Sequence, residues 1–234
     1  MQQVHVIDLG KIAYANSLEI QTQKFETLVN NKLNGQSNND AHFLYLCEHL
    51  PVITLGKSAN ENNVLIPETL LKEKQIDIFH INRGGDVTFH GLGQITGYPI
   101  LDLDFFTSDL KKYMRQLEEV IIQTIKVFEI EGYRIEDATG VCVNSIIDKQ
   151  PKKIVAFGLK SSRWITMHGF ALNVDVDLSY FNLINPCGFT DKGVTSIANE
   201  LKNKDDKPTM LQVKEILLQK FAAVFSAQLI EVAP

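Results

Sequence analysis

The sequence predicts a single α/β domain, residues 1–234, in which a mixed β-sheet is flanked by helices. The length of 234 residues allows one sizeable buried core. The composition, 44% hydrophobic and 22% charged, is close to that of an average globular protein. Apolar runs of strand length alternate with helix patterns, and the chain has no internal repeat and no linker other than the charged loop 202–207. These observations favour one unit over two.

The first half of the chain is predicted to be rich in strands. A helix is expected over residues 16–33, where apolar side chains recur at helical spacing and Asn34-Gly35 provides a stop. Pro67 opens a short helix that ends near Lys74. The expected strands cover residues 3–8, 43–47, 52–55, 76–81 and 95–103. An irregular, glycine-containing stretch separates the last two strands.

The second half contains the clearest helix, over residues 108–130, with a stripe of apolar side chains on one face. Another amphipathic helix is expected from about 209 to 226. Strands are expected at 140–147, 154–160 and 164–174. Short polar turns at 148–151 and 161–163 join these three strands, which predicts a meander.

Charge and composition narrow the class of protein. A net charge of −5 argues against general binding to nucleic acid or to anionic membranes, because both need a surplus of Lys and Arg. The N-terminus has no signal-peptide pattern, and no apolar run reaches membrane-spanning length. Three scattered cysteines are too few for a disulfide framework. We therefore expect a soluble, cytoplasmic protein with reduced thiols.

The densest functional signal is the loop Arg83-Gly-Gly-Asp-Val-Thr-Phe-His90-Gly-Leu-Gly93. Glycines after a strand let the backbone approach a ligand and offer N–H groups to an anion or a carbonyl oxygen. The loop lacks the ending of a phosphate-binding P-loop and the glycine spacing of a dinucleotide site. A tight loop with a purely structural role is the alternative.

The element Thr-x-His-Gly occurs twice, at residues 88–91 and 166–169. The two histidines and Cys187 are residue types that ligate zinc, but their spacing matches no metal motif. We predict no metal, and a hydrogen-bonding role for both histidines.

Cys187 is the candidate nucleophile among the three cysteines. It lies in the turn Asn185-Pro-Cys-Gly188, whereas Cys47 and Cys142 lie in apolar, strand-like surroundings typical of small core residues. A thiol needs a base or a cation nearby to become a thiolate near neutral pH. Lys153, at the start of a strand, is a candidate base. From the residues alone, an inert thiol and a solvated lysine remain open alternatives.

Several motifs follow one another in the order and spacing of one enzyme family. They are Asp8-Leu-Gly10, Glu48-His49-x-Pro51-Val-x-Thr54-x-Gly56, Arg83-Gly-Gly-x-x-Thr-x-His-Gly-x-Gly-Gln94, Tyr98-Pro99-Ile100, Lys153-Ile-x-x-x-Gly158, His168-Gly-x-Ala-Leu-Asn-Val174 and Pro186-Cys187-Gly188. In these motifs the chain resembles the lipoyl(octanoyl) transferases of the biotin/lipoate protein ligase-like superfamily. The match spans nearly the whole chain and implies the fold of the ligase catalytic domain.

The resemblance implies a role for individual residues. It assigns Cys187 as the nucleophile that carries the acyl group as a thioester, and Lys153 as the general base that lowers the pKa of the thiol. The implied acyl-binding residues are Arg83, Gly84, Gly85, Asp86, Val87, Thr88, Phe89, His90, Ala156, Phe157, Gly158, Gly169, Phe170 and Ala171. The chain departs from the family where Phe89 replaces a usual Tyr, Leu92 a usual Pro and Cys142 a common Trp.

The activity implied by the resemblance is transfer of an octanoyl group from acyl carrier protein to a lysine of a lipoyl domain. The implied acceptors are the lipoyl domains of 2-oxoacid dehydrogenase E2 subunits and the glycine cleavage H protein. No cofactor or metal is implied, no nucleic-acid or membrane partner is expected, and we expect a monomer. The alternatives are an ATP-dependent lipoate or biotin ligase, an amidotransferase between lipoyl domains, and a non-enzymatic binding module. Lys57, Lys152, Lys160 and Arg163 are candidates for docking the acidic carrier protein.

Overall fold

A mixed sheet forms the centre of the molecule. The computed structural model describes residues 1–39, 41–135, 139–185 and 193–233. Among these residues, eight strands form one sheet in the order β11-β1-β2-β6-β10-β9-β8-β7. Their bounds are β1 (Gln2–Ile12), β2 (Phe43–His49), β6 (Gln94–Ile100), β7 (Gly132–Arg134), β8 (Val141–Asn144), β9 (Pro151–Ser162), β10 (Ile165–Asn173) and β11 (Ala227–Glu231).

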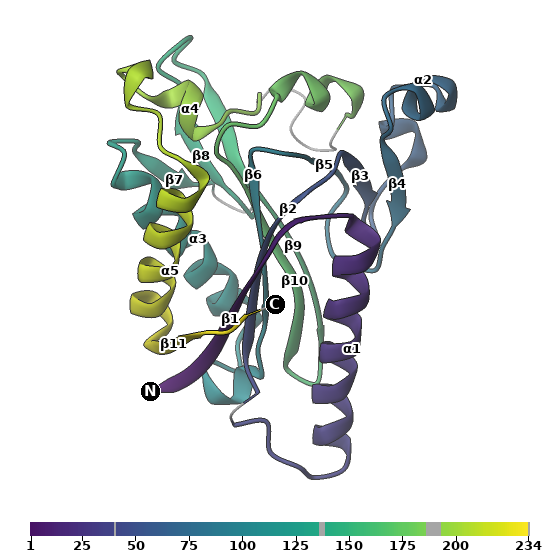
Figure 1. Cartoon of the computed structure of the whole chain (residues 1–234), viewed down its shortest axis with the longest axis vertical. Helices are drawn as coiled ribbons and strands as arrows, with labels where there is room; N and C mark the ends of the chain where they lie inside the picture. The colour runs from purple at the N-terminus through teal and green to yellow at the C-terminus, as the bar shows by residue number, and fades with distance from the viewer. Residues whose placement is uncertain (40, 136–138, 186–192, 234) are drawn as a thin grey trace.

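The pairing within this sheet is both parallel and antiparallel. Strand β1 runs parallel to β11 on one side and to β2 on the other. All pairs from β2 across to β7 are antiparallel. The parallel pairing places β11 alongside β1 at the edge of the sheet (Figure 1). The predicted mixed sheet and the meander over β8, β9 and β10 are confirmed.

A second, smaller sheet lies beside the first. Its strands β4 (Asp77–His80), β3 (Val52–Leu55) and β5 (Val87–His90) lie in that order. Strand β3 is parallel to β4 and antiparallel to β5. The small sheet has its own apolar cluster, in which Ile53, Leu55 and Phe89 are buried. It therefore packs as a separate layer that carries the glycine-rich loop between β4 and β5.

Three long helices cover the large sheet. Helices α3 (Leu110–Lys126) and α5 (Met210–Phe225) lie together on one face, and α1 (Tyr14–Leu33) lies on the other (Figure 1). The Asp109 side chain caps α3, and Thr209 with Gln212 forms a capping box at α5, so their first N–H groups are satisfied. The shorter helices are α2 (Glu68–Glu73), α4 (Ile197–Glu200), η1 (Glu61–Asn63), η2 (Leu103–Phe105), η3 (Leu178–Leu183) and η4 (Lys204–Asp206).

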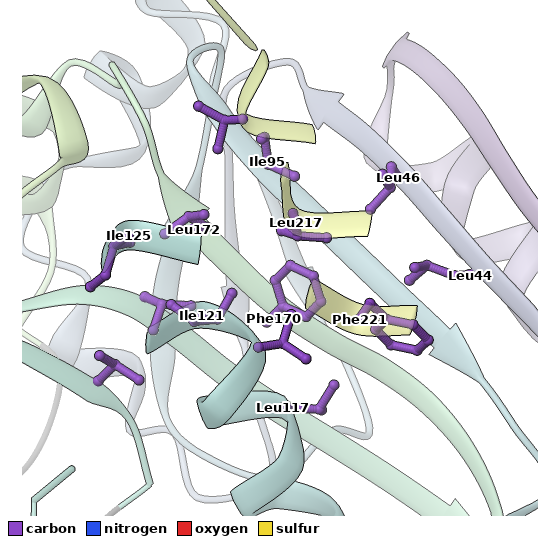
Figure 2. Close-up of a cluster of buried hydrophobic side chains, with 14 of the residues drawn as sticks. Leu44, Leu46, Ile95, Leu117, Ile121, Ile125, Phe170, Leu172, Leu217 and Phe221 are labelled. Atoms are coloured by element: carbon purple, nitrogen blue, oxygen red, sulfur yellow. The ribbon is translucent and has the colours of Figure 1, made fainter. Parts of the chain in front are cut away.

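The main core lies between the large sheet and the α3–α5 pair. Figure 2 shows Leu117 and Ile121 of α3, Phe221 of α5, and Phe170 and Leu172 of β10 in this core. The amphipathic patterns predicted for residues 108–130 and 209–226 point these side chains at the sheet. On the opposite face, a separate cluster joins α1 to β2 and β6. No helix among the described residues is long and apolar enough to span a membrane.

The structure adds three short strands that the sequence patterns did not predict. Strand β5 lies in the stretch expected to be irregular, β7 follows α3, and β11 follows α5. The turn expected at 161–163 lies at Arg163-Trp164, where both residues have positive φ, and β9 continues through Ser162. The predicted helices and the remaining strands are confirmed with shifted ends.

Candidate active site

A cavity of about 390 Å³ lies between the large sheet and the loop that precedes β5. Its floor is formed by small side chains of β9 and β10, with Ala156 opposite Ala171 and Gly158 opposite Gly169. These residues alternate with side chains that pack into the main core, so the floor faces the side of α1. A strip of Gly and Ala along two strands leaves room for a slender apolar ligand.

The glycine-rich loop closes the cavity from above. The Gly84 N–H donates to the Leu159 carbonyl of β9 at 2.8 Å, which ties the loop to the sheet. Gly85 has φ +90°, a conformation that favours glycine. A side chain at Gly56 would meet the Gly85 carbonyl oxygen at 2.3 Å, so glycine is needed there for the close approach of two backbones. The loop predicted from its glycines is therefore both a structural turn and a cavity wall.

Arg83 brings a buried positive charge to one end of the cavity. Its side chain is 7% exposed, and its guanidinium donates to the Thr54 carbonyl and hydroxyl, both at 2.9 Å. It also donates to the Gly84 carbonyl at 3.1 Å. Burial lowers the pKa of Arg83 from its usual value. The side chain crosses Gly158, where an added Cβ would meet Arg83 Cδ at 2.5 Å.

Lys153 lies at the other end of the cavity, and a β-bulge in β9 determines the face of the sheet on which its side chain lies. Consecutive residues of β8 pair with Val155 and Lys153 of β9, so Ile154 is an extra residue. Ile154 and Val155 both pack into the main core. The bulge thus turns Lys153 to the opposite face, where it lines the cavity together with Ala156 and Gly158.

The surroundings of Lys153 favour a neutral amine. Burial is the main cause that lowers the pKa of Lys153, and the nearby Cys142 and Glu118 act in the opposite direction. Cys142 faces Lys153 across the β8–β9 pair, and Glu118 comes from α3. Because the uncharged amine is the form that accepts a proton, this environment suits a general base.

Polar side chains connect the two ends of the cavity. His90 Nδ1 donates to Gln94 Oε1 at 2.8 Å, and Gln94 Nε2 donates to Asn173 Oδ1 at 2.9 Å. Burial lowers the pKa of His90 and of His168 to about 3, so both are neutral near pH 7. His168 has φ +62°, an uncommon conformation for a residue with a side chain. A hydrogen-bonding role for His90 agrees with the prediction for that residue.

The candidate nucleophile Cys187 lies outside the described residues. The described residues on either side of this segment, Ile184 and Val194, both line the cavity. The other two cysteines, Cys47 and Cys142, are fully buried. Burial raises the pKa of the Cys47 thiol well above its usual value, although His49 Nε2 lies 3.4 Å from its sulfur. Cys47 is therefore a poor nucleophile despite its histidine neighbour.

The structure places most of the residues proposed for acyl binding on the cavity. Those that line it are Arg83, Gly84, Gly85, Asp86, Val87, Thr88, His90, Ala156, Phe157, Gly158, Gly169, Phe170 and Ala171. Phe89 is not among the lining residues, because its ring stacks on Tyr180 at 4.7 Å inside the small-sheet cluster. Phe170 is among the lining residues, but its ring packs over Gly97 in the main core and so points away from the cavity.

Other lining residues were not proposed from the sequence. They include Tyr14, Gln94, Thr96, Tyr98, Met114, Thr139, Asn173, Phe181, Ile184 and Val194. Gln94 and Asn173 belong to the motifs described above. A polar residue within an otherwise apolar strand is the signal that could have identified each of them. Tyr14 and Met114 reach the cavity from helices, and no sequence pattern marks them.

Two further expectations can be compared with the structure. No group of three His, Cys, Asp or Glu side chains suited to a metal ion occurs in residues 1–39, 41–135, 139–185 and 193–233. The four candidate docking residues do not form one cluster. Lys152 lies near the start of the long strand β9 and Arg163 directly follows its end, about 36 Å away for a fully extended strand. That grouping was wrong, because a long strand carries residues close in sequence far apart in space.

Comparison with known proteins identifies similar chains. The model of the lipoyl protein ligase A/B catalytic domain family matches residues 15–222. An octanoyltransferase of Parabacteroides distasonis is 50% identical over 223 residues, which make up 95% of this chain and all of that protein. An octanoyltransferase of Cytophaga hutchinsonii is 46% identical over 228 residues, which make up 95% of this chain and 92% of that protein.

The fold also resembles a solved structure. It is a bipartite lipoate protein ligase of Thermoplasma acidophilum, with a TM-score of 0.74 and 13% sequence identity. The match covers all of this chain and 88% of the ligase. The expected ligase-like fold is thereby confirmed.

Proposed function

Because this chain belongs to the octanoyltransferases of the lipoyl protein ligase A/B catalytic domain family, we propose that it moves an octanoyl group from acyl carrier protein to a lysine of a lipoyl domain through a thioester on Cys187. The implied acceptors are the lipoyl domains of 2-oxoacid dehydrogenase E2 subunits and the glycine cleavage H protein. The proposed location is the cytoplasm, where a free thiol stays reduced.

One observation carries this proposal: a narrow apolar cavity has a desolvated lysine at one end and borders both flanks of the segment that holds Cys187. Asn173 lies near Lys153, and Gly169 lies four residues further along β10, or about 13 Å. A medium-length acyl chain fits along this floor. Cys187 follows Ile184 by three positions, and three extended residues reach about 11 Å at most. The length of chain between Ile184 and Cys187 therefore permits a thioester on Cys187 to enter the cavity, as the proposal requires.

In the first half-reaction the Lys153 amine takes the proton of the Cys187 thiol. The thiolate attacks the thioester carbonyl of the donor, and a carbon–sulfur bond forms as the carbonyl oxygen becomes an oxyanion. The intermediate then expels the thiolate of the carrier's prosthetic group, which takes the proton back from Lys153. One thioester replaces another, so the step needs neither ATP nor an oxidant. Backbone N–H groups that stabilise the oxyanion contribute about 10²–10³ in rate.

In the second half-reaction the lysine amine of the acceptor attacks the Cys187 thioester. A carbon–nitrogen bond forms, Lys153 takes one proton from the attacking nitrogen, and the Cys187 thiolate leaves. The thiolate then takes that proton from Lys153, which restores the enzyme. A neutral Lys153 is needed at the start of each half-reaction, and its burial supplies this state at a lower pH than solvent would.

A donor comparison tests this proposal against the ligase alternative. Purified protein is given a lipoyl domain with either octanoyl acyl carrier protein or free octanoate plus ATP. We expect octanoylation of the lipoyl domain from the carrier protein alone. Transfer that requires ATP and free octanoate would contradict the proposal and favour a ligase. Transfer only from another octanoylated lipoyl domain would favour an amidotransferase, and binding without transfer would favour a non-enzymatic module.

A further inference from the structure

The strand that carries Lys153 changes partner beside the cavity. Strands β9 and β10 pair from Ser162 opposite Ile165 to Val155 opposite Leu172. Beyond that point residues 193–195 take the place of β10. The Lys153 N–H donates to the Gly193 carbonyl, and the Thr195 N–H donates to the Lys153 carbonyl, both at 2.9 Å. The backbone of Lys153 is thus fixed on this side by a segment that is not part of the sheet.

One side chain joins this segment to the sheet. Asn173, the last residue of β10, donates from Nδ2 to the Thr195 carbonyl at 3.0 Å. Its Oδ1 accepts from Gln94 Nε2 at 2.9 Å. Asn173 and Gln94 are 3% and 1% exposed, so water does not compete for these bonds. A buried amide that loses its partner costs about 1–3 kcal/mol, which makes the bridge firm.

The bridge is the end of a longer chain of hydrogen bonds. Gln94 Oε1 accepts from His90 Nδ1, and His90 Nε2 faces the Thr54 hydroxyl at 3.4 Å. Thr54 in turn accepts from Arg83. Each group donates to the next, from the glycine-rich loop to residue 195. Bonds in such a chain polarise one another, so the orientation of the Asn173 amide is set by the whole chain.

We infer that Asn173 is a positioning residue, which holds residues 193–195 against Lys153 and so keeps the Lys153 amine at its place on the cavity. Asn173 does not exchange protons with the substrate in this scheme. Its effect reaches the reaction through the placement of Lys153. A base displaced by about 1 Å loses on the order of 10²-fold in rate.

The charged state of Lys153 reports on this role. Groups from two elements face it, namely Cys142 from β8 and Glu118 from α3, and both favour the charged amine. Among the described residues, burial is the largest cause and acts against them, because it disfavours the charged form. Loss of the Asn173 bridge admits water at residues 193–195. The pKa of Lys153 then rises toward its ordinary value, and less of the neutral amine is present at a given pH.

The test compares Asn173→Ala with the wild type and with Asn144→Ala. Asn144 lies exposed on β8, where its side chain accepts from Tyr133 at 3.0 Å, so this control removes an asparagine outside the chain of hydrogen bonds. Lys153 is labelled with acetic anhydride over a range of pH and followed by mass spectrometry. For Asn173→Ala we expect about tenfold slower labelling at a fixed pH below the pKa. The control should match the wild type.

Two further measurements complete the test. Amide hydrogen exchange at Thr195 should become faster in Asn173→Ala, and kcat should fall about 10–100-fold with little change in KM. The kcat measurement rests on the proposed function, whereas labelling of Lys153 and hydrogen exchange at Thr195 do not. Failure of this inference can therefore be distinguished from failure of the proposed function. Unchanged labelling and exchange in a folded Asn173→Ala protein would overturn the inference. If that variant does not fold, Gln94→Ala, which frees the Asn173 amide, should show the same labelling change, and an unchanged rate would overturn it.

Discussion

At the scale of single residues, the protonation of Lys153 decides what the cavity can do. A solvated lysine is charged at pH 7 and cannot accept a proton. In this protein burial lowers the pKa of Lys153, while Cys142 and Glu118 limit how far it falls. Burial thus shifts the amine toward the neutral form, which both half-reactions of the proposed mechanism use. The amine of the neighbouring Lys152 pairs with Asp148 at 2.7 Å.

We predict that Lys153→Met lowers kcat by about 10²–10⁴-fold, the usual contribution of a general base. Lys152→Met is the matched control and should retain activity. In the wild type, activity should rise with pH as Lys153 loses its proton, with a midpoint below the ordinary lysine value because burial lowers its pKa. The rate of acyl transfer measured over pH checks both points. Full activity of Lys153→Met would exclude its role as base.

At the scale of elements, the β-bulge in β9 is the feature that builds the site. Regular alternation would place Lys153 on the same face as Val155, inside the main core. The extra residue Ile154 reverses this, so Lys153 shares a face with the small residues of the floor. The motif Lys153-Ile-x-x-x-Gly158 marks both ends of this stretch. The bulge itself could not be predicted, because it depends on the pairing of β9 with β8.

The floor of the cavity gives a prediction about acyl length. We expect Ala156→Leu to reduce kcat/KM for an octanoyl donor by about 10–200-fold, since one or more added methylene groups occupy space that the acyl tail needs. A butyryl donor should be affected much less. Donor series measured with both chain lengths check this. Ser161→Leu, further along β9 and not among the lining residues, serves as control. Equal loss for both donors would contradict a cavity that holds the tail along β9.

The elements that the sequence did not predict share a physical cause. Strands β5, β7 and β11 have three to five residues each, too short for a periodic pattern to emerge. Strands β5 and β11 pair with β3 and β1, which are distant in sequence, so tertiary contacts rather than local preference create these two strands. Helices α3 and α5 were predictable because their apolar stripes are long. The resemblance assigned Phe89 to the cavity together with its neighbours in the loop. Because β5 was not predicted, the alternation of side chains along it could not show that the Phe89 ring lies on the other side of this strand.

At the scale of the whole molecule, the protein places a small sheet beside a large one and buries polar groups near their junction. His49, His90 and His168 are buried near this junction, and burial lowers their pKa values to about 4, 3 and 3. These histidines are neutral in the folded protein. Burial is the largest cause of these lowered pKa values, because a charged ring loses its hydration inside the protein. The folded protein therefore disfavours a proton on any of the three histidines.

This arrangement predicts a dependence of stability on pH. The buried histidines contribute fully to the free energy of unfolding above about pH 6.5, the ordinary histidine pKa, because both the folded and the unfolded chain then hold neutral rings. As the pH falls toward 3–4, the unfolded chain takes up protons and the folded one does not, so stability is lost. Over this pH range each histidine lowers the free energy of unfolding by up to about 1.4 kcal/mol for each unit by which the pH falls. Urea unfolding at several pH values measures it.

The control for this prediction is an exposed histidine. His80→Gln changes an exposed side chain and should keep the slope of the wild type. His168→Asn should reduce the slope, because one of the buried titrating groups is gone. A slope that stays the same in His168→Asn but changes in His80→Gln would show that the buried histidines are not responsible.

The proposed mechanism requires the acyl group to rest on Cys187 during transfer. The protein is mixed with octanoyl acyl carrier protein without acceptor, digested and examined by mass spectrometry, with Cys187→Ala, Cys142→Ala and Cys47→Ala treated alongside. We predict an octanoyl thioester on the peptide that contains Cys187, retained in the Cys142 and Cys47 variants and absent from Cys187→Ala. An adduct on another residue, or one that persists in Cys187→Ala, would contradict the account.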